Sequence, residues 1–202
     1  MKLFFHYCSF GFSNCFVLGA KDVPKALVID PGGMDSYILD YIERNNLSLE
    51  AVLVTHDHVG HVRGLRTLRR IYQPEIFAIN RVVLDIVTTQ VKDGDRIGIG
   101  PFTVDVISIP GHSADSVVYR IGSLLFTGDV LTTGLVGTTD SAYGTKTQMN
   151  ALRSRLLSLP GDYTILPGHG PPSTLEAERR YNVGINQYSE TQNRRPGFKL
   201  NL

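Results

Sequence analysis

The sequence predicts an α+β fold in which two layers of β-strands carry helices on their outer faces. Short, uninterrupted apolar segments, such as residues 26–29 and 51–54, are typical of buried strands. Residues 61–72 place leucines on one face and arginines elsewhere, which is typical of an amphipathic helix. Histidine or aspartate follows several strand ends, and two stacked sheets would bring those ends to one edge.

The first third of the chain is predicted to consist mainly of strands that end at turns of small and polar residues. Strands are expected at residues 2–8, 15–18, 26–29 and 51–54. The Asp-Pro-Gly-Gly segment at 30–33 ends the third of them sharply. Ile38, Tyr41 and Ile42 have helical spacing, so a helix is expected between the third and fourth strands.

The remainder of the chain continues this alternation. Strands are expected at 102–109, 117–119, 124–126 and 164–166, with a tight turn at 122–123 and a helix at 152–159. Ser173 is expected to cap a last helix that runs towards Tyr188. Residues 1–190 are interpreted as one domain, and the polar residues 191–202 as a C-terminal tail.

Composition favours one soluble domain and argues against several classes of function. The 202 residues suffice for a substantial core, and the net charge of +1 gives no electrostatic basis for binding nucleic acid or an anionic membrane. No apolar segment approaches the ~20 residues that span a bilayer, and no secretory signal is recognised, so a cytoplasmic location is expected. Cys8 and Cys15 lack the spacing of a metal motif and are interpreted as core residues.

Five of the six histidines and one aspartate form a pattern suited to metal binding. They are His56, His58, His61, His112, Asp129 and His169. Imidazole and carboxylate are ligands for zinc and iron. His56 and His58 are two residues apart, so both side chains can project towards one ion, which His112 would complete. Asp129 can bridge to a second ion held by His61 and His169.

These motifs resemble those of the metallo-β-lactamase superfamily, especially its small glyoxalase II-like hydrolases. The resemblance rests on the Asp30-Pro31-Gly32-Gly33 turn, the Thr55-His56-Asp57-His58-Val59-Gly60-His61 loop and the contexts of His112, Asp129 and His169. It implies a four-layer αββα sandwich with the metal ions at one edge of the two sheets. Zinc is the expected cofactor, with one or two ions per chain, and iron and manganese are alternatives.

One residue departs from the pattern of that family, which is His-x-His-x-Asp-His. Gly60 occupies the aspartate position, so the second ion would keep only His61, His169 and the shared carboxylate. Asp57 is the candidate catalytic carboxylate that could substitute, although its place after the first histidine turns it away from the neighbouring imidazoles. Its other expected role is a hydrogen bond that orders the loop. With a weak or empty second site, His61 is expected to act as a base or a hydrogen-bond donor.

Two further side chains are candidates for contact with a substrate carboxylate. Tyr143 and Lys146 follow the segment Thr138-Thr139-Asp140, which lies where glyoxalase II-like relatives often carry Gly-Arg-Thr-Asp. No arginine precedes Thr139 here, and Asp140 is expected to order a loop.

The resemblance implies a hydrolase that attacks a thioester or similar activated acyl bond of a small-molecule substrate with metal-bound hydroxide. Two alternatives stay open. A mononuclear iron oxygenase resembling persulfide dioxygenases would use His56, His112 and Asp129, and a non-catalytic relative would keep the fold to bind a ligand. A homodimer is also compatible with the sequence.

Overall fold

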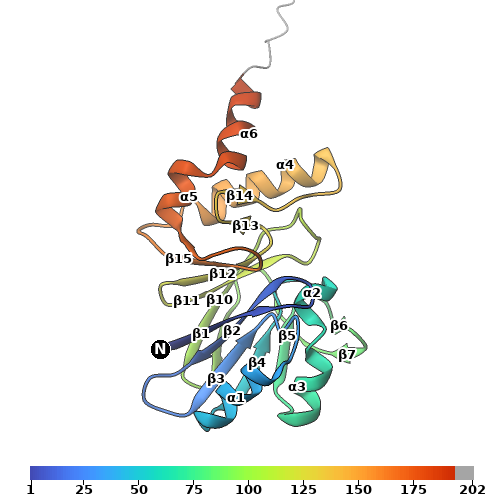
Figure 1. Ribbon diagram of the computed structural model, residues 1–202. Helices are drawn as coiled ribbons and strands as arrows, with labels where there is room; N and C mark the ends of the chain where they lie inside the picture. The colour runs from blue at the N-terminus through green and yellow to red at the C-terminus, as the bar shows by residue number, and fades with distance from the viewer. Residues whose placement is uncertain (194–202) are drawn as a thin grey trace, which may run out of the picture.

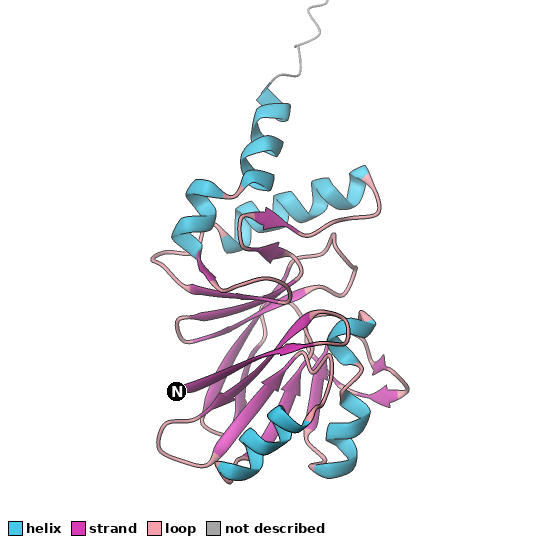
Figure 2. Cartoon of the chain, in the orientation of Figure 1, coloured by secondary structure: helices cyan, strands magenta, loops and turns pink. Residues whose placement is uncertain are grey.

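Two six-stranded β-sheets pack face to face in the computed structural model, which describes residues 1–193 (Figure 1). Helices cover the outer face of each sheet, so the chain has four layers in the order α, β, β, α (Figure 2). This arrangement confirms the predicted αββα sandwich. None of the helices in residues 1–193 is both long enough and apolar enough to cross a bilayer.

The first sheet contains most of the amino-terminal half of the chain. In spatial order its strands are β1 (Lys2–Cys8), β2 (Ser13–Gly19), β3 (Lys25–Ile29), β4 (Ser48–Leu53), β5 (Glu75–Ala78) and β8 (Thr89–Gln90). The first three run antiparallel, and β3, β4, β5 and β8 run parallel. Helices α1 (Ser36–Arg44) and α3 (Leu65–Ile71) cover its outer face. The Asp35 side chain caps α1 by accepting two backbone N–H groups.

The second sheet contains the carboxy-terminal half. In spatial order its strands are β16 (Ser173–Thr174), β15 (Thr164–Pro167), β12 (Leu124–Gly128), β11 (Val117–Ile121), β10 (Phe102–Ser108) and β9 (Arg96–Ile99). Its outer layer contains α4 (Ala142–Ala151), a π-helical turn (Leu152–Leu156), α5 (Leu175–Tyr181) and α6 (Val183–Asn193). Two short hairpins, β6 (Val82–Val83) with β7 (Ile86–Val87) and β13 (Leu131–Thr132) with β14 (Leu135–Val136), complete the fold.

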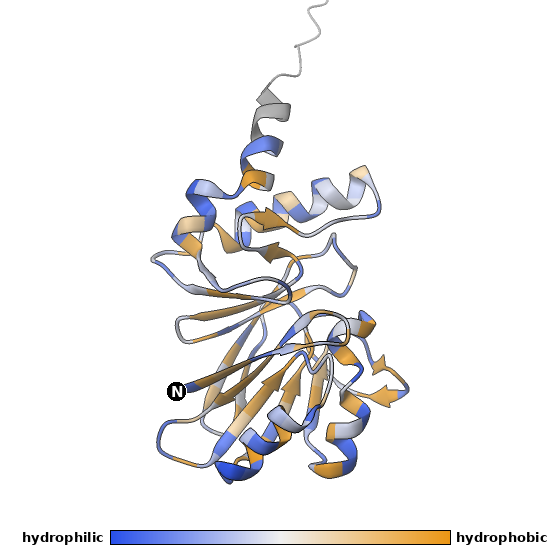
Figure 3. Cartoon of the chain, in the orientation of Figure 1, coloured by the Kyte–Doolittle hydropathy of each residue, from blue (hydrophilic) through white to orange (hydrophobic). Residues whose placement is uncertain are grey.

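Three apolar clusters hold these layers together, and the strands that form them stand out by their hydropathy (Figure 3). The middle cluster fills the space between the sheets with aromatic side chains such as Phe16, Tyr119 and Phe126. The outer clusters bury one face of each helical layer, for example Leu65 and Leu68 of α3 against the first sheet. The central strands are covered on both faces, and the segments 15–18 of β2 and 26–29 of β3 are continuously apolar, as predicted.

The helix predicted at 61–72 is instead two helices, α2 (Val59–Val62) and α3. The break falls at Gly64, whose backbone N–H donates to the Pro31 carbonyl at 2.7 Å. A Cβ atom on Gly64 would lie only 2.6 Å from that oxygen, so the contact requires glycine. The amphipathic pattern correctly predicted which leucines are buried, but it could not reveal this tertiary contact.

The last helix also differs from the prediction. Thr174, and not Ser173, caps α5, and a second helix, α6, begins after a break at Asn182. Ser173 donates instead to the Glu178 carboxylate at 2.5 Å. The predicted tail begins at residue 191, yet α6 continues to Asn193, and residues 194–202 lie outside the described part of the chain.

Candidate metal centre

The candidate ligands lie where the ends of both sheets meet. His56 follows β4 and Asp129 follows β12, while His112 and His169 follow β10 and β15. A backbone hydrogen bond of 2.9 Å from the Val117 N–H to the Thr55 carbonyl joins the end of β4 to the start of β11. The strand ends of the two sheets are thereby held at one edge, as the sequence analysis predicted.

The first group of converging side chains consists of His56, His58, His112 and Asp129. One ligand atom from each lies within 4.8 Å of the others. His112 Nε2 is 3.0 Å from His58 Nδ1 and 3.6 Å from Asp129 Oδ2. His56 Nε2 is 3.7 Å from the same carboxylate oxygen. Three imidazoles and one carboxylate around a common point are a donor set for a divalent ion such as zinc.

A second group shares Asp129 with the first. His61 Nε2 and His169 Nε2 each lie 3.4 Å from Asp129 Oδ2. The same oxygen therefore has four imidazole nitrogens around it, two from each group. This is the placement expected of a carboxylate that bridges two ions.

In four of the five rings, the nitrogen that faces away from the centre contacts a neighbouring group, and we call these the outer contacts. They set the tautomer of each ring. His61 Nδ1 lies 3.2 Å from the Asp30 carboxylate, His112 Nδ1 lies 2.8 Å from the Thr138 carbonyl and His169 Nδ1 lies 2.7 Å from the Phe12 carbonyl. An imidazole facing such an acceptor donates its Nδ1–H, so the neutral form of the ring presents the Nε2 lone pair to the centre. Thr55 Oγ1 donates its hydrogen to Asp30 at 2.6 Å. The same oxygen lies 3.1 Å from His56 Nδ1 and therefore accepts from it, which orients the His56 ring in the same way as the other three.

Several buried polar atoms at the centre fit a bound cation. Among the described residues, His56 Nε2, His61 Nε2 and Asp129 Oδ1 are buried and have no hydrogen-bond partner. Leaving such atoms unpaired costs free energy, on the order of 1–3 kcal/mol each. Gly168 contributes the necessary space, because a Cβ atom there would lie 2.4 Å from Asp129 Oδ1 and 2.5 Å from His61 Cε1. The donor set, its tautomers and its unpaired atoms therefore agree with metal binding.

The electrostatics of the centre favour positive charge. Burial, with the nearby His61, lowers the pKa of His56 to about 2, so this ring is neutral and available as a ligand. Burial opposes the charge on His61, but the neighbouring carboxylates of Asp129 and Asp30 outweigh it and raise its pKa to about 10. Burial also opposes ionisation of Asp129, yet the surrounding imidazoles hold the pKa of its carboxyl below the usual range. The buried Asp30 and the partly buried Asp129 thus attract a cation to this position.

The structure does not bring Asp57 to the centre. Its carboxylate accepts the Asn80 side-chain N–H at 2.8 Å, and its backbone N–H donates to Asp115 at 3.0 Å. This placement does not support the predicted catalytic role of Asp57, because consecutive side chains in the extended loop point to opposite sides. It agrees with the other expected role, a hydrogen bond that orders the loop.

At Gly60 a Cβ atom would lie 3.5 Å from Gly11 Cα, an ordinary contact.

The two candidate substrate-binding residues lie on α4. Tyr143 is 80% exposed, and Lys146 is also exposed. Helix α4 packs against the turn before His112, since a Cβ on Gly144 would lie 3.1 Å from the Gly111 carbonyl oxygen. Both side chains therefore project from an element that borders the first group, and their contact with substrate stays a prediction.

Sequence reasoning missed Asn14 and the roles of Asp30 and Thr55. Asp30 follows a buried strand, so a signal for it existed in the Asp-Pro-Gly-Gly turn. Asn14 is a polar residue inside β2, a strand that is buried throughout. A polar side chain in a buried strand needs hydrogen-bond partners, and this requirement could have indicated its role. The carbonyl acceptors of Phe12 and Thr138 carry no signal, because every residue has a carbonyl.

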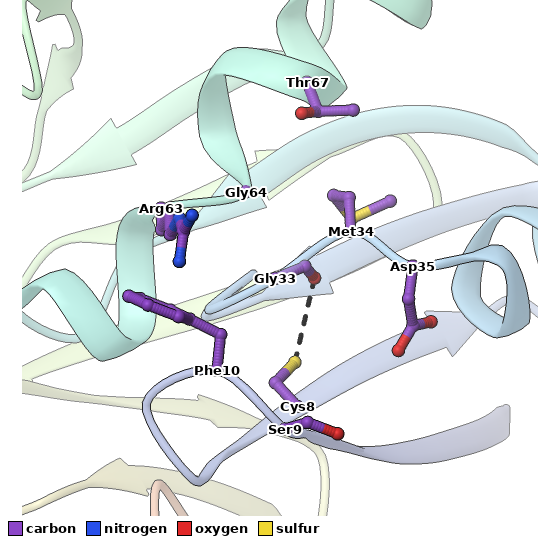
Figure 4. Close-up of a pocket in the computed structure, with 9 residues that line it drawn as sticks. All are labelled: Cys8, Ser9, Phe10, Gly33, Met34, Asp35, Arg63, Gly64 and Thr67. Atoms are coloured by element: carbon purple, nitrogen blue, oxygen red, sulfur yellow. Dashed lines mark hydrogen bonds between the residues drawn. The ribbon is translucent and has the colours of Figure 1, made fainter.

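A separate cavity of about 400 Å³ lies next to the β1–β2 loop (Figure 4). It is lined by Cys8, Ser9, Phe10, Gly33, Met34, Asp35, Arg63, Gly64 and Thr67, and by no residue of either metal group. The Arg63 guanidinium lies 3.5 Å above the Phe10 ring, and Cys8 Sγ donates to the Gly33 carbonyl at 3.7 Å. Cys8 and Cys15 are both free and buried, as predicted.

Comparison with known proteins agrees with this geometry. The family model of the metallo-beta-lactamase superfamily matches residues 8–86 and 80–169. Hydroxyacylglutathione hydrolase GloC of Haemophilus influenzae is 28% identical, with 87% of this chain and 94% of the relative covered. ETHE1 from Myxococcus xanthus is 25% identical with a TM-score of 0.83, covering 100% of this chain and 92% of the other. TTHA1623, solved in a di-iron-bound form, is 26% identical with a TM-score of 0.75, covering 89% and 98%. The chain belongs to the metallo-beta-lactamase superfamily.

Proposed function

We propose that the protein is a metal-dependent hydrolase that cleaves a thioester or a similarly activated acyl bond. The observation that carries the proposal is the position of Asp129 Oδ2, which has four imidazole nitrogens at 3.4–3.7 Å. The similarity to a hydroxyacylglutathione hydrolase over most of both chains supports the choice of bond.

In this proposal, His56, His58 and His112 would hold one ion and His61 and His169 a second, with the Asp129 carboxylate available to both. A bound divalent ion would polarise a carbonyl oxygen and lower the pKa of a coordinated water to about 7. Contacts at Nδ1 of His56, His61, His112 and His169 leave Nε2 of each ring facing the centre, where it would bind an ion, in the case of His61 after its proton is released.

The second group, His61 and His169 with the shared Asp129, forms the second half of the centre and has two roles in the proposal. With an ion present, His61 and His169 are ligands. With that half empty, His61 Nε2 lies 3.4 Å from Asp129 and its Nδ1 is held by Asp30, so the ring is fixed where it can take up or donate a proton. Tyr143 and Lys146 are proposed to contact a carboxylate of the small-molecule substrate.

The test combines metal analysis with hydrolysis of S-lactoylglutathione by the zinc-loaded protein. We expect stoichiometric zinc and measurable turnover for the native chain. His58→Ala should lose both, since it removes one of three nitrogens from the first ion. His6→Ala is the matched control, because His6 lies in β1 and pairs with Asp35 at 2.6 Å, away from both groups. Activity of His58→Ala equal to that of the native chain would contradict the proposal.

One observation favours an iron oxygenase as the second candidate. His56, His112 and Asp129 place two imidazoles and one carboxylate around a single point, a donor set that suits non-haem iron. Protein purified without added metal would then contain iron and consume oxygen with glutathione persulfide. Stoichiometric zinc and no oxygen uptake would eliminate this candidate.

A further inference from the structure

Phe12, in the β1–β2 loop, and Asn14, near the start of β2, contact the loop that carries His169, although about 155 residues separate the two segments. The Phe12 carbonyl accepts from His169 Nδ1 at 2.7 Å. The Asn14 backbone N–H donates to the Gly168 carbonyl, also at 2.7 Å. The amino-terminal hairpin thus holds both the ring and the backbone of one ligand-bearing loop.

The Asn14 side chain provides the central part of this contact. Its amide donates to the Pro167 carbonyl at 2.9 Å and to the Gly170 carbonyl at 2.7 Å. With the backbone contact, three of the four carbonyls from 167 to 170 accept a hydrogen bond from Asn14. Asn14 is 1% exposed, and its buried amide holds the loop on both sides of His169, at Pro167 and at Gly170.

The same segment also contacts the loop of the other second-group histidine. Ser13 Oγ donates to the Gly60 carbonyl at 2.5 Å, directly before His61. Gly11 approaches Gly60 closely, since a Cβ atom on Gly11 would lie 2.6 Å from Gly60 Cα. Residues 11–14 therefore connect the two segments that supply His61 and His169, whereas His58 and His112 have no hydrogen bond to these residues.

We propose that Asn14 is the positioning residue of the second half of the metal centre: its side-chain amide holds the loop of His169 so that the second ion can bind. The inference rests on the proposed two-ion centre. Asn14 touches no ligand atom itself and acts through the backbone at 167–170. Its amide group is required because alanine would leave the buried Pro167 carbonyl and the Gly170 carbonyl without these donors, and aspartate would add negative charge beside them.

The experiment is a titration of the metal-free protein with Co²⁺, followed by visible absorption, which separates two binding steps without any turnover. We expect the first step of Asn14→Ala to match the native chain and its second step to weaken by about 10- to 100-fold, as is usual when an outer contact of a ligand is lost. His169→Ala serves as the reference for loss of the second step. Asn150→Ala, an exposed asparagine on α4, is the matched control.

Circular dichroism would show whether Asn14→Ala folds, and Asn14→Ser, which keeps one donor, replaces it if it does not. Three outcomes would overturn the inference. The native chain could show a single binding step, the variant could keep its second step unchanged, or both steps of the variant could weaken equally. These outcomes are distinct from failure of the proposed function. A protein that binds two ions and hydrolyses no thioester would refute the reaction and leave the role of Asn14 intact.

Discussion

Asp30 Oδ2 lies 3.2 Å from His61 Nδ1 and 2.6 Å from Thr55 Oγ1, so one carboxylate orients ligands of both metal groups. Thr55 passes this orientation to His56 through its hydroxyl at 3.1 Å. Asp30 has a φ of 49°, a left-handed conformation that aspartate tolerates better than most residues. The turn after β3 therefore places a buried carboxylate behind the centre, and a strained backbone there is consistent with a functional position.

Asp30→Asn should weaken metal binding by about 10- to 100-fold while the protein stays folded. Asp30 accepts from Thr55 twice and from His61, and an amide in its place must point an N–H at one of these donors. Isothermal titration with Zn²⁺ measures the effect. Asp40→Asn is the control, because Asp40 pairs with Arg44 on the surface of α1. Equal affinity of Asp30→Asn and the native chain would show that the contact has no such role.

Gly60→Asp should raise the occupancy of the second half of the centre. A Cβ atom at this position meets Gly11 Cα and its carbonyl oxygen at 3.5 Å, an ordinary van der Waals contact, so the backbone can accept the side chain. The added carboxylate restores the His-x-His-x-Asp-His pattern and increases the negative charge beside His61. Elemental analysis after dialysis against limiting zinc should show more metal per chain than in the native protein. Unchanged stoichiometry would mean that the second half is already complete.

The fold could be predicted because its central strands are buried on both faces. Segments such as 26–29 and 51–54 are apolar without interruption, and the structure places 26–29 in β3 and 51–53 in β4. The break at Gly64 could not be predicted, since it depends on the Pro31 carbonyl, which the helical pattern does not contain. Short hairpins such as β6–β7 were missed for a related reason: strands of two residues have no measurable alternation.

The convergence of the ligands was also predictable, because each follows a strand end and strand ends meet at one edge. The direction of Asp57 followed from its place between His56 and His58, and its contact with Asn80 agrees. What the sequence could not supply was the outer contacts. Asn14 reaches the His169 loop only through tertiary structure, and nothing in its neighbours 13 and 15 indicates that partner.

Gly168→Ala should disrupt the second half of the centre, although the substitution adds only one methyl group. The new Cβ would lie 2.4 Å from Asp129 Oδ1 and 2.5 Å from His61 Cε1, far inside van der Waals contact, so one of these groups must move. We expect loss of the second Co²⁺ step and a marked fall in turnover. Gly98→Ala is the control, since its Cβ would meet no heavy atom within 4 Å. Retention of both steps in Gly168→Ala would show that the loop can shift without cost.

Removal of the metal should lower the thermal stability of the native chain. The ion binds the folded state and pairs buried atoms of His56, His61 and Asp129 that otherwise have no partner. At a free zinc concentration 100 times the Kd, the stabilisation is about 2.7 kcal/mol, or a shift in Tm of roughly 5–10 °C for a chain of this size. Unfolding followed by circular dichroism, with zinc and after chelation, measures the shift. His6→Ala should keep it in full, and His58→Ala should lose most of it, because the first ion then has only two imidazoles. A native chain with the same Tm in both conditions would argue against metal binding at this centre.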